Sequence, residues 1–316
     1  MKLFDRSKRF IACAILVCFI PSQAWAQGIT IPSGSSLNIA AGQLTVPGGI
    51  TNAGTLSATT GTIKLSGNWA NSGTFSAGTS TVTFNAASGT QTLNSGGTSS
   101  TTDAFYNLTH NAAGTAQLIS NALTINNNFT NTSGTFNANS LNMTVSNNWN
   151  NTATFTPGTD TVTLNGANQT ISGSTTFYQF TKTVTSSAAL IFDHTGTQTF
   201  TNSLTMQGAS AQLLNIRSDS AGTQANIALS AGGLQVLKYL DVADSNASGG
   251  LLLNDNNGVN SGNNTNWNFG GTTLTWKGGT STAWNTATNW DLGFVPRSSD
   301  TVIIANAANQ PVLSST

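Results

Sequence analysis

This sequence of 316 residues contains no glutamate, and its only two cysteines, Cys13 and Cys18, lie close to the N-terminus. Charged residues make up only 6% of the chain. Because glutamate, lysine and arginine usually cover the exposed faces of helices, their scarcity argues against long helices. Thr, Asn, Ser and Gly take their place, and these residues favour strands and turns. We therefore expect an all-β protein.

The N-terminal segment, residues 1–26, has the features of a secretory signal peptide. Four basic residues within the first nine positions precede an apolar run over residues 10–20, and Ala24-Trp25-Ala26 follows. The run is too short to cross a hydrocarbon core of roughly 30 Å as a helix. Its small-x-small ending predicts cleavage after Ala26. We expect a secreted or cell-surface protein that begins at Gln27, with no transmembrane helix in the mature chain.

Cleavage at this site would change the chemistry of the chain. Both cysteines leave with residues 1–26, which excludes a disulfide-stapled scaffold and a thiolate metal site. Six basic residues then remain against nine aspartates, a net charge of −3. Such a charge-poor, weakly acidic surface does not attract nucleic acid or an anionic membrane. We expect no nucleic-acid partner.

Similar phrases of about 20 residues recur along the chain. The clearest copies are GNWANSGTFSAGTSTVTFNAASGTQTL from Gly67, NNFTNTSGTFNANSLNMTVS from Asn127 and NNWNNTATFTPGTDTVTLNGANQTISG from Asn147. Ile50 and Trp69 hold equivalent places in consecutive copies, as do Phe129 and Trp149, and both spacings agree with this period. The period suits one coil of a solenoid, which becomes stable when coils stack and bury their apolar sides.

Within each phrase, polar and apolar residues alternate over a short strand. Val82 and Phe84, like Val162 and Leu164, are separated by single threonines, so each pair points to one side of its strand. Gly, Asn, Ser and Pro bound the strands and predict turns. We expect a parallel β-helix (β-solenoid) over residues 27–270, with about twelve coils stacked at about 4.8 Å. The stretch 94–103, rich in Ser, Gly and Thr, is expected to leave the rod as a loop.

Most of the mature chain resembles a known group of proteins, and two later segments carry the resemblance most specifically. The segments KYLDVADSNAS from Lys238 and SGNNTNWNF from Ser261 are similar to the closing coils in repetitive β-helix regions of large bacterial surface and secreted proteins, including adhesins and autotransporter passengers. The resemblance implies a right-handed parallel β-helix outside the cell, with binding partners that differ between members. Residues 271–316, with Trp276, Trp284 and Trp290, resemble the start of a second Trp-rich β module, and we expect the protein to continue beyond Thr316.

Two pairs of residues are the best candidates for catalysis. Asp241 and Asp244 are possible paired carboxylates of a glycosidase, but on one continuous strand residues three apart face opposite ways, so they would meet only if a turn intervenes. Asp193 and His194 are neighbours that would also face apart on a strand, and no nucleophile motif lies nearby. A structural or surface role is favoured for both pairs.

Metal ligation is also disfavoured. His110 has no His or Cys at ligand spacing and is expected at an exposed strand end. The sequence Asp255-Asn256-Asn257-Gly258 has the composition of a calcium loop, but without the further acidic ligands of such loops it predicts an Asn-Gly turn.

The aromatic residues and threonines leave two binding functions to weigh. Trp69, Phe129 and Trp149 share a place in the repeat, which favours packing between coils over contact with sugars. Trp276, Trp284 and Trp290 are the residues to test first for carbohydrate binding, although their spacing also fits module packing. An ice-binding array would need a Thr-x-Thr pair on nearly every coil, and such pairs recur too rarely here.

These patterns predict a structural or adhesive β-solenoid without catalytic activity. We expect no catalytic, cofactor-binding or metal-binding residues and no cofactor. The expected partner is a surface ligand, either a glycan or a protein of a host or neighbouring cell. The alternative is a carbohydrate-active β-helix enzyme, a polysaccharide lyase or glycosidase, or a glycan-binding module. Three or more aspartates on one exposed face over consecutive coils would favour the enzyme.

Overall fold

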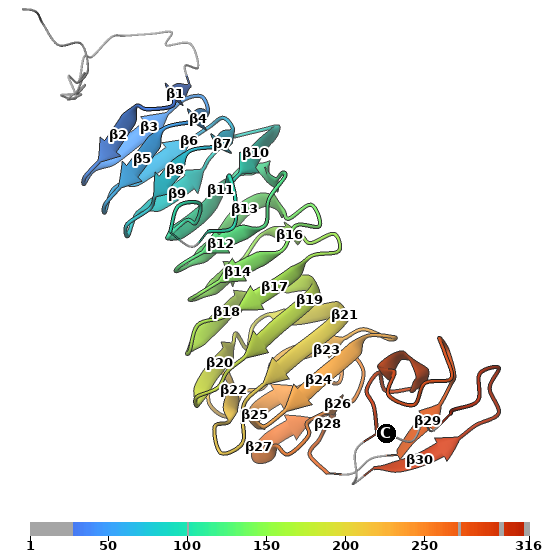
Figure 1. Cartoon of the computed structure of the whole chain (residues 1–316). Helices are drawn as coiled ribbons and strands as arrows, with labels where there is room; N and C mark the ends of the chain where they lie inside the picture. The colour runs from blue at the N-terminus through green and yellow to red at the C-terminus, as the bar shows by residue number, and fades with distance from the viewer. Residues whose placement is uncertain (1–27, 100, 271–272, 297–299, 313–316) are drawn as a thin grey trace, which may run out of the picture.

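The computed structural model describes residues 28–99, 101–270, 273–296 and 300–312. The chain winds into a parallel β-solenoid of about 11 turns, each of about 21 residues, and Figure 1 shows these turns stacked into a rod that ends at a small terminal unit. The all-β prediction and the predicted period are therefore confirmed. The predicted signal peptide lies outside the described residues.

Most turns contribute strands to three faces of the rod, and most of these strands pair in parallel with the equivalent strand of the next turn. The first face carries β1 (Ile29–Ile31), β4 (Ile50–Asn52), β7 (Trp69–Asn71), β10 (Thr90–Asn94), the second half of β11 (Asn107–Leu118) and of β13 (Phe129–Asn137), β16 (Thr154–Thr156), the first half of β19 (Thr175–Thr183) and of β21 (Thr197–Gln207), β23 (Ala225–Leu229), and the second half of β25 (Leu240–Asn246) and of β27 (Val259–Thr265).

The second face begins with β2 (Ser36–Ile39), β5 (Thr55–Ala58) and β8 (Thr74–Ser76). It resumes with β12 (Leu123–Ile125), β14 (Met143–Val145), β17 (Thr161–Leu164), the second halves of β19 and β21, β24 (Leu234–Lys238), β26 (Leu253–Asn254) and β28 (Trp267–Asn268).

The third face carries β3 (Gln43–Val46), β6 (Thr62–Leu65), β9 (Thr81–Phe84), the first halves of β11 and β13, β15 (Trp149–Asn151), β18 (Gln169–Gly173), β20 (Ala188–Phe192), β22 (Leu214–Ser218), and the first half of β25 (Leu240–Asn246) and of β27 (Val259–Thr265). Beyond the solenoid lie β29 (Thr273–Trp276) and β30 (Thr301–Ile304), which pair with each other. The only helical segment in the described residues is the single 3-10 turn η1 (Ala287–Asn289).

Inward-pointing side chains form one hydrophobic core along the rod. Val82, Phe84, Val162 and Leu164 are buried, as the alternation predicts. Aromatic rings from successive turns are in contact, for example Trp149, whose ring centroid lies 4.3 Å from that of Phe129. The core role predicted for the repeat aromatics is thus confirmed.

The repeat phrases do not lie on equivalent faces, which the spacing did not predict. Trp69 belongs to the first face, where it pairs with Ile50 and Leu93, whereas Trp149 belongs to the third face, where it pairs with Phe129 and Ile171. The phrase has rotated by one face between its copies. Each copy keeps its local turns and alternation, because any of the three faces can accept a short strand with the same inside and outside.

The long connection after β10 produces part of this shift. Among its described residues, none between Asn94 and Asn107 belongs to a strand, as predicted for a loop. It does not simply leave the rod, however. Phe75 N donates to Thr102 O on the return, and Phe105 is fully buried with its ring 5.1 Å from that of Trp69. The loop closes the second face where a regular strand is missing.

The terminal unit has a small hydrophobic cluster of its own, built on Leu274, Trp276, Trp290 and Phe294. Trp276 and Trp290 meet edge to face with ring centroids 5.0 Å apart. Trp276 Nε1 donates to Asn309 O and Trp290 Nε1 donates to Trp284 O. These indoles therefore pack the unit, which leaves only the half-buried Trp284 partly available to a ligand.

Candidate functional site

Buried amides line two inner edges of the rod. On the third face His110 Nδ1 lies 2.8 Å from Asn131 Oδ1, and Asn131 Nδ2 donates to Asn151 Oδ1 at 2.7 Å. His110 is fully buried in β11, so the prediction of an exposed strand end is wrong. The strand continues past His110 through a register shift, and its inward position is satisfied by an amide ladder. Burial lowers the pKa of the His110 imidazole, against a smaller opposing effect of its hydrogen bond to Asn131.

Two further ionisable side chains lie inside the rod. Burial raises the pKa of the Asp160 carboxyl to about 7, and neither of its oxygens has a hydrogen-bond partner among the described residues. Burial lowers the pKa of the Lys182 ammonium to about 8. Lys182 Nζ donates to Ala167 O at 2.9 Å and to Gln169 Oε1 at 2.6 Å. Both groups are buried, so a bound ligand outside the rod would not touch them.

Asp193, His194 and Asp219 come together on two successive turns. They follow the ends of β20 and β22 rather than lying within a strand, so the expectation that Asp193 and His194 face apart does not apply. His194 Nδ1 lies 2.8 Å from Asp219 Oδ1, and possible ligand atoms of the three residues lie within 4.8 Å of one another. Asp193 already accepts hydrogen bonds from Thr195 and from Gly173 N. These hydrogen bonds stabilise the turns that follow β20 and β22.

Asp241 and Asp244 both lie in β25, but the pairing of this strand is irregular between them. The register shifts after Val242, and Asp244 has a positive φ of 58°, so the simple alternation expected for one continuous strand is broken. Asp241 Oδ2 lies 2.6 Å from Arg217 Nη2 in an ion pair. Asp244 accepts hydrogen bonds from Asn263 Nδ2 at 2.7 Å and Gly222 N at 3.0 Å, and these bonds lower the pKa of its carboxyl.

The turn predicted at Asp255–Gly258 is present, with Asn257 at a φ of 59°. Asp255 is fully buried beneath it and its Oδ1 accepts a hydrogen bond from Leu240 N at 3.4 Å. A carboxylate turned into the core is unlike the ligand of a surface calcium loop.

One regular array lies on the outside of the second face. Threonines occupy the same outward position on five successive turns and are paired in register: Thr124, Thr144, Thr163, Thr181 and Thr205. The outward position two residues earlier is mixed, with Thr161, Gln179 and Ser203 in register. The sequence analysis did not predict this single column of threonines. The Thr-x-Thr pair needed for an ice-binding array does not repeat from turn to turn, as expected.

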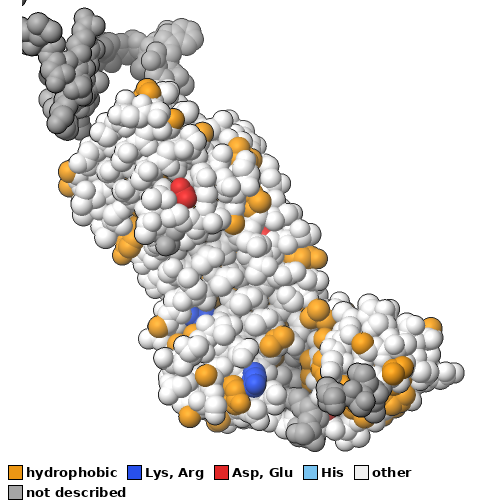
Figure 2. Space-filling model, in the orientation of Figure 1, with side chains coloured by type: hydrophobic (Ala, Val, Ile, Leu, Met, Phe, Trp, Pro, Cys, Tyr) orange, Lys and Arg blue, Asp and Glu red, His pale blue; other side chains and the backbone are white. Residues whose placement is uncertain are grey.

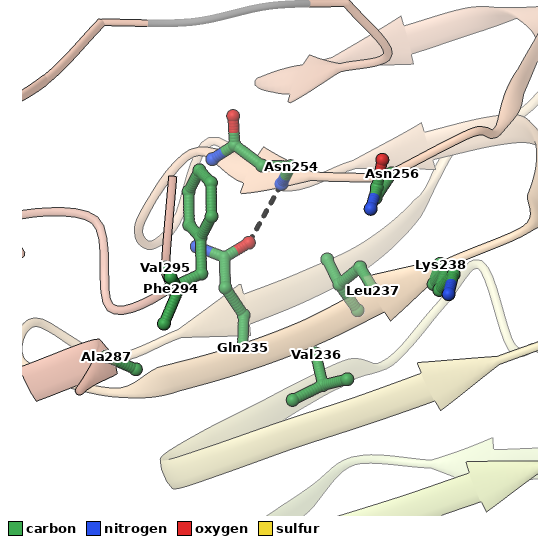
Figure 3. Close-up of a pocket in the computed structure, with 9 residues that line it drawn as sticks. All are labelled: Gln235, Val236, Leu237, Lys238, Asn254, Asn256, Ala287, Phe294 and Val295. Atoms are coloured by element: carbon green, nitrogen blue, oxygen red, sulfur yellow. Dashed lines mark hydrogen bonds between the residues drawn. The ribbon is translucent and has the colours of Figure 1, made fainter. Parts of the chain in front are cut away.

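A cavity lies where the last turns meet the terminal unit. It has a volume of about 250 Å³. Figure 3 shows residues of β24 along one side, Asn254 and Asn256 of the next turn opposite them, and Phe294, Val295 and Ala287 of the terminal unit at one end. Val236 is half exposed. No sequence motif indicated this cleft, because its walls come from three segments that only the winding of the chain brings together.

At this junction the backbone of β24 lies close to the backbone of the terminal unit. Gln235 N donates to Gly293 O at 3.2 Å, and Gln235 Nε2 donates to Leu292 O at 2.8 Å and Leu252 O at 3.0 Å. Gln235 Oε1 accepts a hydrogen bond from Asn254 N at 2.8 Å. One buried amide therefore holds the last turns and the terminal unit together.

These features define the chain as a parallel β-solenoid with a cleft at the junction to its terminal unit. No family model, no curated protein and no solved structure matches the chain. No helix in the described part of the chain is long and apolar enough to cross a membrane.

Proposed function

We propose that the protein is an exported, non-catalytic β-solenoid rod that presents its terminal unit and surface loops to a ligand outside the cell. The observation that carries this proposal is the continuous core, which runs through successive turns and makes the solenoid a stiff spacer. Stacking at about 4.8 Å per turn gives about 50 Å of rod. Export is inferred from the signal-peptide features of residues 1–26.

The surface supports a structural or adhesive role. Most of the face seen in Figure 2 is neither charged nor hydrophobic, and only a few charged side chains appear on it. Among the described residues, four of the exposed or half-buried aspartates are held by hydrogen bonds or ion pairs within turns: Asp193, Asp219, Asp241 and Asp244. Carboxylates already held in this way are poorly placed to serve as a free acid and base.

A carbohydrate-active enzyme is the second candidate, and the proximity of Asp193, His194 and Asp219 on successive turns favours it. The decisive experiment uses residues 27–316 with a panel of neutral and acidic polysaccharides. Retention on the polysaccharide and the release of new reducing or unsaturated ends are measured in parallel. We expect retention without product. Product that disappears in Asp219→Asn, but persists in the control Asp103→Asn, would establish the enzyme instead.

A further inference from the structure

The junction cleft has two chemically different ends. Val236, Leu237, Phe294, Val295 and Ala287 supply apolar surface, and Figure 3 shows the three residues of the terminal unit at the end away from Lys238 and Asn256. Hydrophobic side chains also gather around this junction in Figure 2. A cleft of this kind suits a ligand with an apolar body and one polar group.

The polar end offers hydrogen-bond donors and a positive charge. Lys238 and Asn256 are paired neighbours on successive turns, and both are half-buried. Within the described residues, the side-chain amide of Asn256 makes no hydrogen bond, and Lys238 Nζ has no acidic partner and lies 4.8 Å from the centre of the Tyr239 ring. An ammonium and an amide N–H side by side are complementary to a carboxylate, whose charge strengthens both hydrogen bonds.

The walls are fixed before any ligand arrives. Gln235 bonds to both sides of the junction, and Gly293, at a φ of +71°, approaches the backbone so closely that an added Cβ would lie 2.3 Å from Gly233 O. A preformed site loses little conformational entropy when it binds a ligand.

We propose that this cleft binds a small organic acid, a carboxylate carried by a compact apolar group. The carboxylate lies between Lys238 and Asn256, and the apolar group packs on Val236 and Phe294. The volume of about 250 Å³ suits a single small unit. This inference goes beyond the rod function and holds whether or not the protein is an adhesin.

The test measures binding of 3-phenylpropionate to residues 27–316 by calorimetry and by chemical-shift changes. The uncharged 3-phenylpropanamide has the same shape without the charge, and we expect it to bind at least roughly tenfold more weakly. N-acetyl-Gly-Phe with a free C-terminus tests whether the acid belongs to a peptide end. Tighter binding of the peptide than of 3-phenylpropionate would assign the site to a chain terminus, and weaker binding would assign it to a free acid.

The matched variants are Lys238→Gln and Lys64→Gln. Both replace a half-buried lysine of an outward strand position, but Lys64 lies on β6, far along the rod from the cleft. Lys238→Gln should weaken binding of the acid at least roughly tenfold and leave the amide unchanged, while Lys64→Gln should change neither. Absence of binding at millimolar acid, equal binding of acid and amide, or equal effects of the two substitutions would each overturn the proposal. Unchanged unfolding midpoints of both variants show that the comparison is made on folded protein.

Discussion

At the scale of single residues, Asp160 is an ionisable side chain in an unfavourable, buried position. Its carboxyl is fully buried in the turn that precedes β17, and no described group donates a hydrogen bond to it. In the phrase that starts at Gly67, Ser80 occupies the same local position and is also buried. The buried position just before the strand is therefore occupied by a titratable side chain in one phrase, Asp160, and by a neutral side chain in the other, Ser80.

This comparison gives a pH prediction. The folded pKa of Asp160, about 7, lies above its ordinary value of 3.8, so folding favours the protonated form. The stability that this proton provides is fully present below about pH 4 and is lost as the pH rises towards 7, at about 1.4 kcal/mol per pKa unit. Asp160→Ser should therefore gain stability over the wild type between pH 4 and pH 8, by a few kcal/mol in denaturant unfolding.

The control is the reverse change, Ser80→Asp, which should lose stability over the same pH range. His110 contributes a slope of the opposite sign, because its lowered folded pKa costs stability as the pH falls below 6.5. Differences between variants remove this common background. A difference between Asp160→Ser and wild type that stays constant from pH 4 to pH 8 would show that the carboxyl is not titrating as described.

At the scale of the repeat element, similar phrases meet different surroundings after they rotate between faces. Trp149 Nε1 donates to Thr175 Oγ1 at 3.1 Å. Trp69, at the same place in its phrase, has no hydrogen-bond partner for Nε1 among the described residues. Both rings are buried and pack against other aromatic rings, but only the Trp149 indole donates a hydrogen bond.

Replacing each indole by phenylalanine isolates that difference. Trp149→Phe loses a buried hydrogen bond, whereas Trp69→Phe removes a buried donor that is unsatisfied, so we expect Trp149→Phe to cost about 1 kcal/mol more. Urea unfolding of both variants provides the measurement, and each serves as the other's control because the loss of ring volume is the same. An equal or larger cost at Trp69 would contradict the interpretation.

At the scale of the whole molecule, the terminal unit is attached to the rod through a close backbone contact at Gly293. A side chain there would meet Gly233 O and would also have to adopt a positive φ. We expect Gly293→Ala to loosen this attachment without unfolding the solenoid, because the rod has its own core. Hydrogen exchange should accelerate at Gln235 and in residues 273–296, while β11 to β21 stay protected.

Gly249→Ala is the control, since its Cβ would meet only Ala228 Cβ at 3.5 Å. If Gly293→Ala exchanges like Gly249→Ala, the contact at Gly233 does not hold the two parts together. Faster exchange throughout β11 to β21 would instead mean that the terminal unit is part of the folding unit of the rod.

The sequence alone was sufficient for the class of fold. The lack of glutamate, the short repeat period and the alternation at Val82-Thr83-Phe84 depend only on local preference and on which residues avoid water. They predicted short strands, turns, buried aromatics and stacked coils. The number of turns, about 11 rather than twelve, differs because the turns are slightly longer than the repeat.

Only the winding of the chain decided which residues meet. His110 was predicted at an exposed strand end, but β11 continues past it and His110 lies on the buried side of the strand. The alternation rule failed at Asp193 and Asp244, because a turn and a positive φ interrupt the strands in ways that no local pattern marks. The threonine column and the cleft at Lys238 join residues from different turns, and their positions depend on the lengths of every connection in between. The local sequence determines which segments can form strands and which side chains point inward. The tertiary structure determines which strands lie side by side, and the candidate site consists of residues from different turns that lie side by side.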